Sequence, residues 1–290
     1  MYRRTDRPAS VAKAFVILFG SFILCYLACN AVGAALMFLL PTYAGLISVM
    51  ALSSVGIWAA AGLIGRRYVV GRKIAHSRGY VTPYIILLAG FTALLSQPFV
   101  EWANYMDLII GEKLGTTSWT LSQTSNQIMA QCALFDNVWH WFLSILVLAA
   151  LPAISEELFF RGALLPLIKR ATGNWTAAVI ISAVVFSAIH LDASAFLART
   201  VLGIILGVLF VQTKNIWVST TFHFTNNLLV VIMLSQSEDV VSTLSRTPEL
   251  PDTYYTIISI VFTIFELSFI QRYTTMRKAF LETGKKNGFF

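Results

Sequence analysis

The sequence predicts an all-α fold, a polytopic transmembrane helical bundle, and three observations support this prediction. Of the 290 residues, 57% are hydrophobic and only 12% are charged, about half the charged fraction that is usual in soluble domains. Residues 14–65 contain no Asp, Glu, Lys or Arg. As one helix this run would be about 78 Å long, against a hydrocarbon core of about 30 Å, so the chain must fold back, and Pro41 is the natural place. These values exclude a soluble enzyme, a nucleic-acid-binding domain and a disordered chain.

Hydrophobic stretches divide the chain into about eight predicted spans. They cover residues 14–40, 44–65, 83–100, 138–168, 175–191, 194–212, 216–234 and 254–271. No segment between them is long or polar enough to be a separate soluble domain. We therefore expect residues 1–290 to form a single integral membrane domain in the lipid bilayer, with the motif-bearing core at about residues 138–234.

The net charge of +7 is explained by topology. With eight spans, 17 of the 21 Lys and Arg residues fall on one side of the membrane. Because basic residues accumulate in cytoplasmic loops, we expect both termini in the cytosol, and the plasma (inner) membrane as the location if the source is bacterial. No nucleic acid is needed to explain the charge. The outward segments, 101–137 and 235–253, are polar, and the first could hold an amphipathic helix on the outer surface.

Cysteines add little to this interpretation. Cys25 and Cys29 lie one helical turn apart in the first predicted span, where thiols usually pack as small apolar groups. Cys132 has no obvious partner in its outer loop. No disulfide framework is predicted.

The informative residues are polar and ionisable groups inside the predicted spans, because each charge buried in hydrocarbon costs at least about 2.5–3.5 kcal/mol. Three of the eight spans carry these groups. They are Glu156, Glu157, Arg161, His190, His223, Asn226 and Asn227.

Helical spacing separates the two glutamates. Glu157 and Arg161 are four residues apart with the acid first, which is the favourable orientation for an ion pair. Glu156 is rotated by about 100° from Glu157 and has no such partner on its own helix. We therefore predict that Arg161 neutralises Glu157 and that Glu156 faces a cavity.

Depth in the membrane indicates that polar side chains from the three spans meet. Measured from the cytosolic ends of the spans, Glu156, His190, His223 and Asn227 lie at depths of about 20, 24, 14 and 20 Å. His223 and Asn227 also share one helix face, with Asn226 on its flank. We expect substitution of Asn226 to matter less than substitution of Asn227.

The motifs around these residues resemble a known family. SEELFFRG at 155–162 matches an EExxxR motif, FSAIH at 186–190 matches FxxxH, and HFTNN at 223–227 matches HxxxN. In this order they are similar to the signatures of the CAAX protease and bacteriocin-processing (CPBP) family of intramembrane proteases, which includes the CAAX prenyl endopeptidases.

The resemblance implies a bundle with a water-filled cavity and a glutamate-dependent endopeptidase site. Carried over to this sequence, it implies that Glu156 and His190 activate water and that His223 and Asn227 bind the oxyanion. Glu157 and Arg161 then support the site. The implied substrate is a peptide or a protein, and the sequence does not identify which one.

A second class of function stays open from the residues alone. A non-proteolytic membrane scaffold, an immunity-type protein or a transporter could use the same polar cluster for a ligand or for protons. A transporter would be expected to show pairs of helices broken by Gly or Pro in two symmetric halves. Only Pro152, in the span at 138–168, hints at such a break.

No cofactor is expected, and zinc is the alternative. Glu156, His190 and His223 would supply a His₂Glu set, which is a catalytic zinc pattern. Histidine ligands usually have a carboxylate or carbonyl partner, and no carboxylate in the sequence stands out as a partner for either histidine. No HExxH, GxSxG or nucleotide-binding loop is present in the sequence.

Other residues of these spans have structural interpretations. Phe186 is expected to pack, and Gly203 with Gly207 predicts close approach of a neighbouring helix. Asp192 and Arg199, at the outer end of their hairpin, are a candidate ion pair.

Overall fold

The computed structural model describes residues 9–69, 81–114, 127–236 and 249–286. Within these ranges the chain is helical and contains no β-strand, which confirms the predicted fold class. The helices follow one another in this order: α1 (Val11–Leu39), α2 (Thr42–Leu52), α3 (Ala60–Val69), α4 (Pro83–Leu95), α5 (Gln97–Leu114), α7 (Val138–Ser144), α8 (Leu151–Phe159), α9 (Leu165–Thr172), α10 (Trp175–Ala188), α11 (Phe196–Thr213), α12 (Ile216–Ser235) and α14 (Thr253–Lys286).

Several of these helices continue into one another through π-helical turns. The turn Ser53–Ala59 joins α2 to α3, and the turns Ile145–Ala150 and Phe160–Leu164 join α7, α8 and α9. The second set forms a single helical rod of 35 residues, Val138–Thr172, which carries the EExxxR motif. Such π-turns inside helices occur frequently at functional sites.

Local capping signals set the helix ends. The chain folds back at Pro41, between α1 and α2, as predicted. The Asn174 and Asn215 side chains cap the starts of α10 and α12 by accepting hydrogen bonds from backbone N–H groups. Gly173 and Lys214, with φ values of 70° and 52°, end α9 and α11 in the left-handed conformation typical of helix C-termini.

The number of membrane-spanning helices is close to the predicted eight. By length and composition, six helical segments can cross a bilayer, and a seventh is formed if α4 and α5, bent by 43°, act as one broken span. The remaining predicted span, residues 175–191, corresponds to α10, whose 14 residues reach only about 21 Å.

Residues 101–114 belong to the segment 101–137 that was predicted to lie outside and to allow an amphipathic helix, and the structure makes them helical as part of α5, which ends at Leu114. The Asp107 side chain in this helix is buried and accepts hydrogen bonds from the first residues of α11. A charge that is used to cap another helix cannot be recognised from the hydropathy of its own segment.

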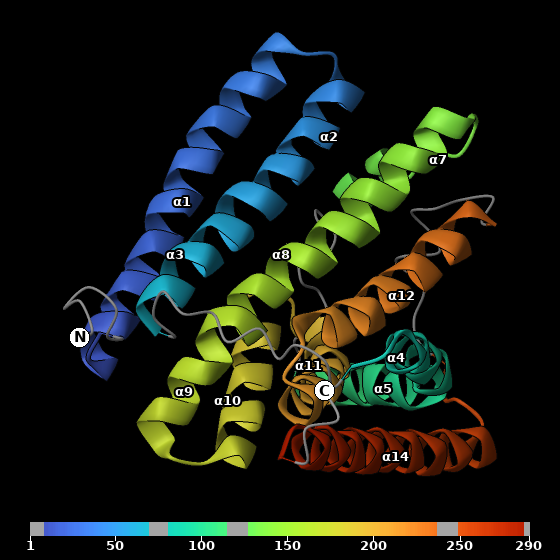
Figure 1. Ribbon diagram of the computed structural model, residues 1–290. Coiled ribbons are helices and arrows are strands. Elements are labelled where there is room, and N and C mark those ends of the chain that lie inside the picture. Colours follow the sequence, from blue (N-terminus) through green and yellow to red (C-terminus); the bar gives the residue numbers. More distant parts are fainter. Residues whose placement is uncertain (1–8, 70–80, 115–126, 237–248, 287–290) are drawn as a thin grey trace.

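The helices enclose two apolar clusters. The first is built from α1, α3, α8, α9 and α10, and the second from α4, α11, α12 and α14. Figure 1 shows α1 and the α2–α3 helix as an antiparallel pair on one side, with the α7–α9 rod running diagonally between this pair and the rest of the molecule. Phe186 belongs to the first cluster and Phe222 to the second, and both line the cavity described below.

Small residues allow the closest helix contacts, as predicted for Gly203 and Gly207. A Cβ atom on Gly203 would lie 2.9 Å from Ala183 Cα on α10, so only glycine fits there. The α3 helix approaches α8 in the same way, because a Cβ atom on Gly62 would lie 2.7 Å from Phe159 N. These contacts fix the helices on both sides of the segment that carries the two glutamates.

Candidate active site

A cavity of about 380 Å³ lies at the junction of the two apolar clusters. Eleven of its lining residues are apolar, contributed mainly by α11 and α12. The polar lining residues are Glu156, His190, Arg199, His223, Asn226 and Asn227. The structure therefore brings together the four residues predicted to share one layer, from α8, the turn after α10, and α12.

Glu157 and Arg161 form the predicted ion pair behind the cavity. Arg161 Nη1 lies 2.7 Å from Glu157 Oε1, and the two side chains are 1% and 0% exposed. Arg161 Nη2 donates a second hydrogen bond of 3.0 Å to the Gly203 carbonyl on α11. The pair thus neutralises one buried carboxylate and ties the α8 segment to α11.

Glu156 lies one residue earlier and faces the cavity, as its rotation on the helix predicts. Its Oε2 is 3.8 Å from His223 Nε2, which is within ion-pair range but too long for a direct hydrogen bond. The Glu156 and His223 side chains are 11% and 8% exposed. Glu156 is therefore a nearly buried carboxylate that faces a space next to His223.

His223 has a carboxylate on each side. Its Nδ1 lies 3.3 Å from Glu157 Oε1, and its Nε2 faces Glu156. Because an ionised carboxylate can only accept, the contact with Glu157 places a proton on His223 Nδ1. The expectation that neither histidine has a carboxylate partner is therefore wrong for His223. The sequence does not reveal this contact because Glu157 and His223 are 66 residues apart.

His190 lies just beyond the end of α10, whose last residue is Ala188. Its Nδ1 is 2.7 Å from the carbonyl oxygen of Phe186. That oxygen can only accept, so Nδ1 carries the proton and the neutral ring has its lone pair on Nε2. The next residue, Leu191, has a φ of 53°, a left-handed conformation that is strained for a residue with a side chain.

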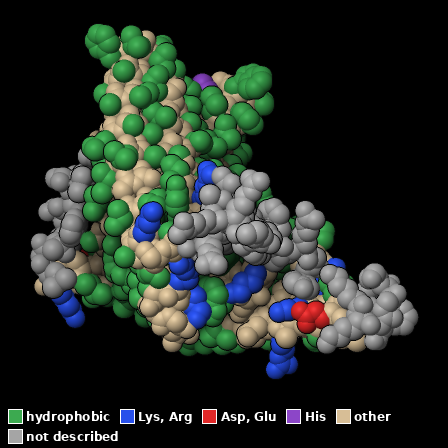
Figure 2. Space-filling model, turned by 60° about the vertical axis from the view of Figure 1, so that its left-hand side comes forward, with side chains coloured by type: hydrophobic (Ala, Val, Ile, Leu, Met, Phe, Trp, Pro, Cys, Tyr) green, Lys and Arg blue, Asp and Glu red, His purple; other side chains and the backbone are tan. Residues whose placement is uncertain are grey.

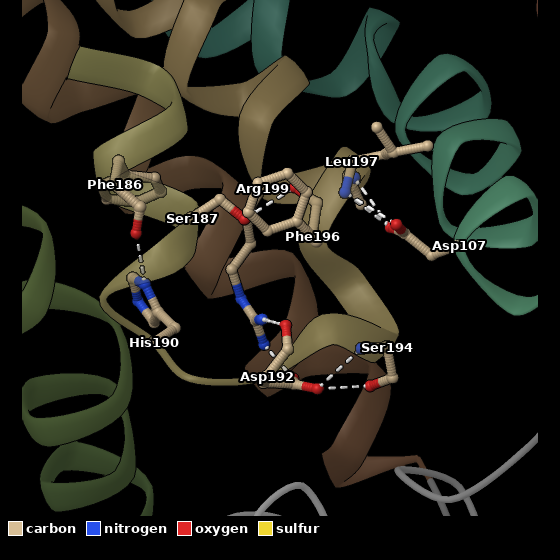
Figure 3. Close-up of polar contacts among 10 residues, drawn as sticks. Asp107, Phe186, Ser187, His190, Asp192, Ser194, Phe196, Leu197 and Arg199 are labelled. Carbon is tan, nitrogen blue, oxygen red and sulfur yellow. Dashed lines mark hydrogen bonds and ion pairs between the residues drawn. The ribbon is translucent and has the colours of Figure 1, made fainter. Parts of the chain in front are cut away.

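Polar contacts hold this strained turn in place (Figure 3). Arg199 donates to the Asp192 carbonyl at 3.0 Å and to Asp192 Oδ2 at 2.6 Å, which confirms the candidate ion pair. Asp192 Oδ1 accepts from the backbone N–H and the hydroxyl of Ser194. The turn that carries His190 is thus fixed to α11 through the side chain of Arg199.

Asp107 fixes the start of α11 from the other side (Figure 3). Its carboxylate accepts from Leu197 N at 2.8 Å and from Ala198 N at 3.1 Å. These N–H groups belong to the first turn of α11, where no partner within the helix exists. The sequence contains no signal for this contact, which joins residues 90 positions apart.

Phe186 lies next to three polar side chains of the site, those of His190, His223 and Arg161. Its ring centroid lies 5.1 Å from that of His190, 5.9 Å from that of His223 and 5.4 Å from Arg161 Cζ. The expected packing role agrees with these contacts.

Asn226 and Asn227 lie next to each other on α12 and both line the cavity. Asn226 Oδ1 accepts from Gln97 Nε2 at 3.1 Å, and Asn226 Nδ2 lies 3.4 Å from Asn227 Oδ1. Sequence reasoning missed Gln97. Gln97 is a polar residue directly before Pro98, at the end of an apolar stretch. This pattern indicates a break in the helix, but it does not indicate a hydrogen-bond partner for Gln97.

The candidate zinc ligands Glu156, His190 and His223 face the same cavity. In the ranges that the structure describes, no three His, Cys, Asp or Glu side chains form a group that could hold a metal ion. His190 Nδ1 and His223 Nδ1 are both engaged by protein oxygens, which leaves each Nε2 directed elsewhere.

Comparisons with known proteins concern the segment that builds this site. Residues 138–229 match the family model described as type II CAAX prenyl endopeptidase Rce1-like. The chain is 34% identical over 147 residues to the protein named "Putative membrane peptidase YdiL" of Bacillus subtilis (strain 168), an alignment that covers 50% of this chain and 54% of that protein. The chain thus matches about half the length of this relative. No solved structure matches the chain. The segment matched by the family model contains all three motifs and the six polar residues that line the cavity, so this part of the chain is similar to CAAX-protease-like membrane peptidases.

Proposed function

We propose that this protein is an intramembrane endopeptidase that hydrolyses peptide bonds with a water molecule activated by Glu156. One observation carries the proposal: Glu156, nearly buried and not engaged by Arg161, lines the same cavity as His190, His223 and Asn227. A structural carboxylate at this depth would be expected to have a cation or several donors, as Glu157 has. The match of residues 138–229 to an endopeptidase family supports the same conclusion.

In this mechanism Glu156 accepts a proton from water as the oxygen attacks the scissile carbonyl. His190 presents an unprotonated Nε2, because its Nδ1–H is donated to Phe186 O. That nitrogen accepts a hydrogen bond from the same water, and it then relays the proton taken up by Glu156 to the leaving amine, so that Glu156 is ionised again when the peptide bond has broken. The hydrogen bond to Phe186 fixes the ring tautomer that this role requires.

The oxyanion of the tetrahedral intermediate is stabilised by Asn227 and His223. Asn227 donates from its amide NH₂. His223 already carries a proton on Nδ1 toward Glu157, so donation from Nε2 requires the doubly protonated, cationic ring.

The substrate is a peptide or protein segment that enters the cavity from the membrane. Eleven of the cavity's lining residues are apolar, so the residues next to the scissile bond are expected to be apolar as well. A CAAX preference is stated only in the family description and is not part of this proposal.

The test compares Glu156→Gln with Glu282→Gln in purified, detergent-solubilised protein supplied with a library of apolar peptides. Glu282 is an exposed carboxylate on α14 and serves as the matched control. We expect Glu156→Gln and His190→Ala to abolish cleavage, and Glu282→Gln to retain it. Asn227→Ala should keep measurable turnover, with kcat lower by about 10²–10³-fold, the usual effect of losing one oxyanion donor.

Turnover retained by Glu156→Gln would refute the mechanism. If well-folded wild-type protein cleaves no peptide under any of these conditions, the result favours a non-proteolytic scaffold, an immunity-type protein or a transporter.

A further inference from the structure

Gln97 lies at the bend between α4 and α5 and connects that bend to the cavity. Its Nε2 donates to the Ala93 carbonyl at 2.8 Å and to Asn226 Oδ1 at 3.1 Å. The α4 and α12 helices pack side by side along this contact. The Gln97 amide is thus bonded to the last turn of α4 on one side and to the cavity-lining Asn226 on the other.

The direction of the hydrogen bonds in this group follows from the Ala93 carbonyl. A backbone carbonyl oxygen can only accept, so the amide nitrogen of Gln97, not its oxygen, must face it. The second hydrogen on that nitrogen then requires an acceptor, which orients Asn226 with Oδ1 toward Gln97. Asn226 Nδ2 is consequently on the other side of its amide, 3.4 Å from Asn227 Oδ1.

The same reasoning orients Asn227. Because Asn227 Oδ1 accepts from Asn226, its Nδ2 is directed away from Asn226. Asn227 lines the cavity, and the described part of the chain supplies no hydrogen-bond partner for this nitrogen. The NH₂ group is therefore available as a donor to a bound group.

We propose that Gln97 is a positioning residue of the site, and that the hydrogen bonds from Ala93 through Gln97 and Asn226 fix the orientation of the Asn227 amide. We call this set of four residues the amide relay. The inference rests on the proposed function, in which Asn227 donates to the oxyanion.

The relay matters because an asparagine amide has two chemically opposite ends of nearly the same size. Rotation of its terminal torsion by 180° would replace the NH₂ donor by a carbonyl oxygen, which repels a developing negative charge. Donors to an oxyanion are effective when they are oriented before the reaction begins. The relay supplies that orientation from a backbone group that cannot change its polarity.

The test reverses the polarity of the relay. Gln97→Glu keeps the shape of the side chain and replaces the donor by an acceptor, and Gln97→Met, a second variant, removes the donor without adding a charge. We expect either substitution to lower kcat about tenfold, part of the 10²–10³-fold loss for a missing donor, with KM changed less than about twofold. Gln271→Glu, an exposed position on α14, is the matched control and should leave both constants unchanged.

A second background separates positioning from general structural damage. In an Asn227→Ala protein there is no amide to orient, so Gln97→Met should produce no further loss of kcat. A similar loss in both backgrounds, or no loss in the native background, would overturn the relay.

Thermal unfolding tests the relay without reference to catalysis. If Gln97 and Asn226 are bonded, Gln97→Met and Asn226→Leu should shift Tm by less together than the sum of their separate shifts. Additive shifts would contradict the relay even if the protein proves not to be a peptidase. A failure of Glu156→Gln to abolish turnover would instead contradict the proposed function and leave this coupling measurable.

Discussion

At the scale of single residues, one helical step separates two glutamates with different environments. Glu157 shares its Oε1 between Arg161 and His223, whereas Glu156 faces the cavity. The first carboxylate is held by a full charge and cannot move toward a substrate without leaving Arg161 buried alone. The second makes no side-chain hydrogen bond within the described ranges, where its ion-pair contact is with His223 Nε2 at 3.8 Å, so its oxygens are able to accept hydrogen bonds from water.

Arg161→Ala should be strongly destabilising. The guanidinium is 1% exposed and is bonded to Glu157 and to the Gly203 carbonyl, so its removal leaves a buried carboxylate without a cation. Breaking a buried pair in this way costs about 3–5 kcal/mol in soluble proteins. We expect a lower Tm, a lower yield and a loss of activity, measured beside the exposed control Arg67→Ala. An unchanged Tm would show that the pair does not stabilise the fold.

The metal content of the protein is a separate prediction at this scale. The mechanism above uses Glu156, His190 and His223 without a metal, and we expect active protein to contain less than stoichiometric zinc by elemental analysis. The carboxylate partner found for His223 is also of the kind that supports metal ligands, so the measurement is decisive. Zinc lost together with activity on chelation, and restored with it, would require the three residues to be ligands.

At the scale of elements, the turn between α10 and α11 determines where His190 lies. The turn includes the left-handed Leu191 and is held by Asp192 and Arg199. Backbone strain of this kind persists only where surrounding contacts fix it, and it is frequent at functional sites. Asp107 then holds the first turn of α11, from which Arg199 projects.

Arg199→Ala should therefore reduce turnover by displacing His190. A shift of about 1 Å in a catalytic group can cost about 10²-fold in rate, so we expect a fall in kcat of tenfold or more. Asp192→Asn should lower kcat by breaking the same Arg199–Asp192 ion pair. The double variant Arg199→Ala/Asp192→Asn should then have a kcat no lower than that of the slower single variant. Ser194→Ala removes a different contact of Asp192 and is the control. Additive losses would indicate that Arg199 contacts the substrate instead of positioning the turn.

At the scale of the whole molecule, basic side chains gather at one end of the bundle. Arg170 donates to the carbonyls of Val69 and Ala9, which brings together the ends of α9 and α3 and the start of α1. Lys169 and Lys214 both lie over the ring of Trp175. Figure 2 shows the same separation, with Lys and Arg in the lower half of that face and hydrophobic side chains covering its upper part. The positive-inside rule assigns the end of a membrane protein that is rich in Lys and Arg to the cytosolic side.

We therefore expect this end, and both termini, to face the cytosol. Single cysteines in a background without the three native ones should be labelled from outside at positions Lys113 and Arg246, and only from inside at Arg72 and Lys286. Arg72 and Arg246 lie outside the described residues, and Lys113 is at the end of α5. Labelling of any one position from the opposite side would contradict the topology.

Much of the site could be predicted because its signals are local. The Glu157–Arg161 pair, the cavity-facing Glu156 and the common face of His223 and Asn227 follow from the fixed rotation of an α-helix. The common depth of residues on three spans follows from the thickness of the bilayer and the rise per residue. The extent of α5 and the end of α10 before His190 did not follow, because both depend on contacts made by other helices.

The sequence by itself thus determined the fold class, most of the helical segments, and the polar residues that line the cavity, since hydropathy and helical periodicity act over a few neighbouring residues. Only the tertiary structure decided how those residues are held. Gln97 lies 129 positions from Asn226, Asp107 lies 90 from Leu197, and Glu157 lies 66 from His223. Each of these contacts depends on the angle and register at which two helices pack, which is set by the close approach of residues such as Gly203 and Gly62 and not by any single segment.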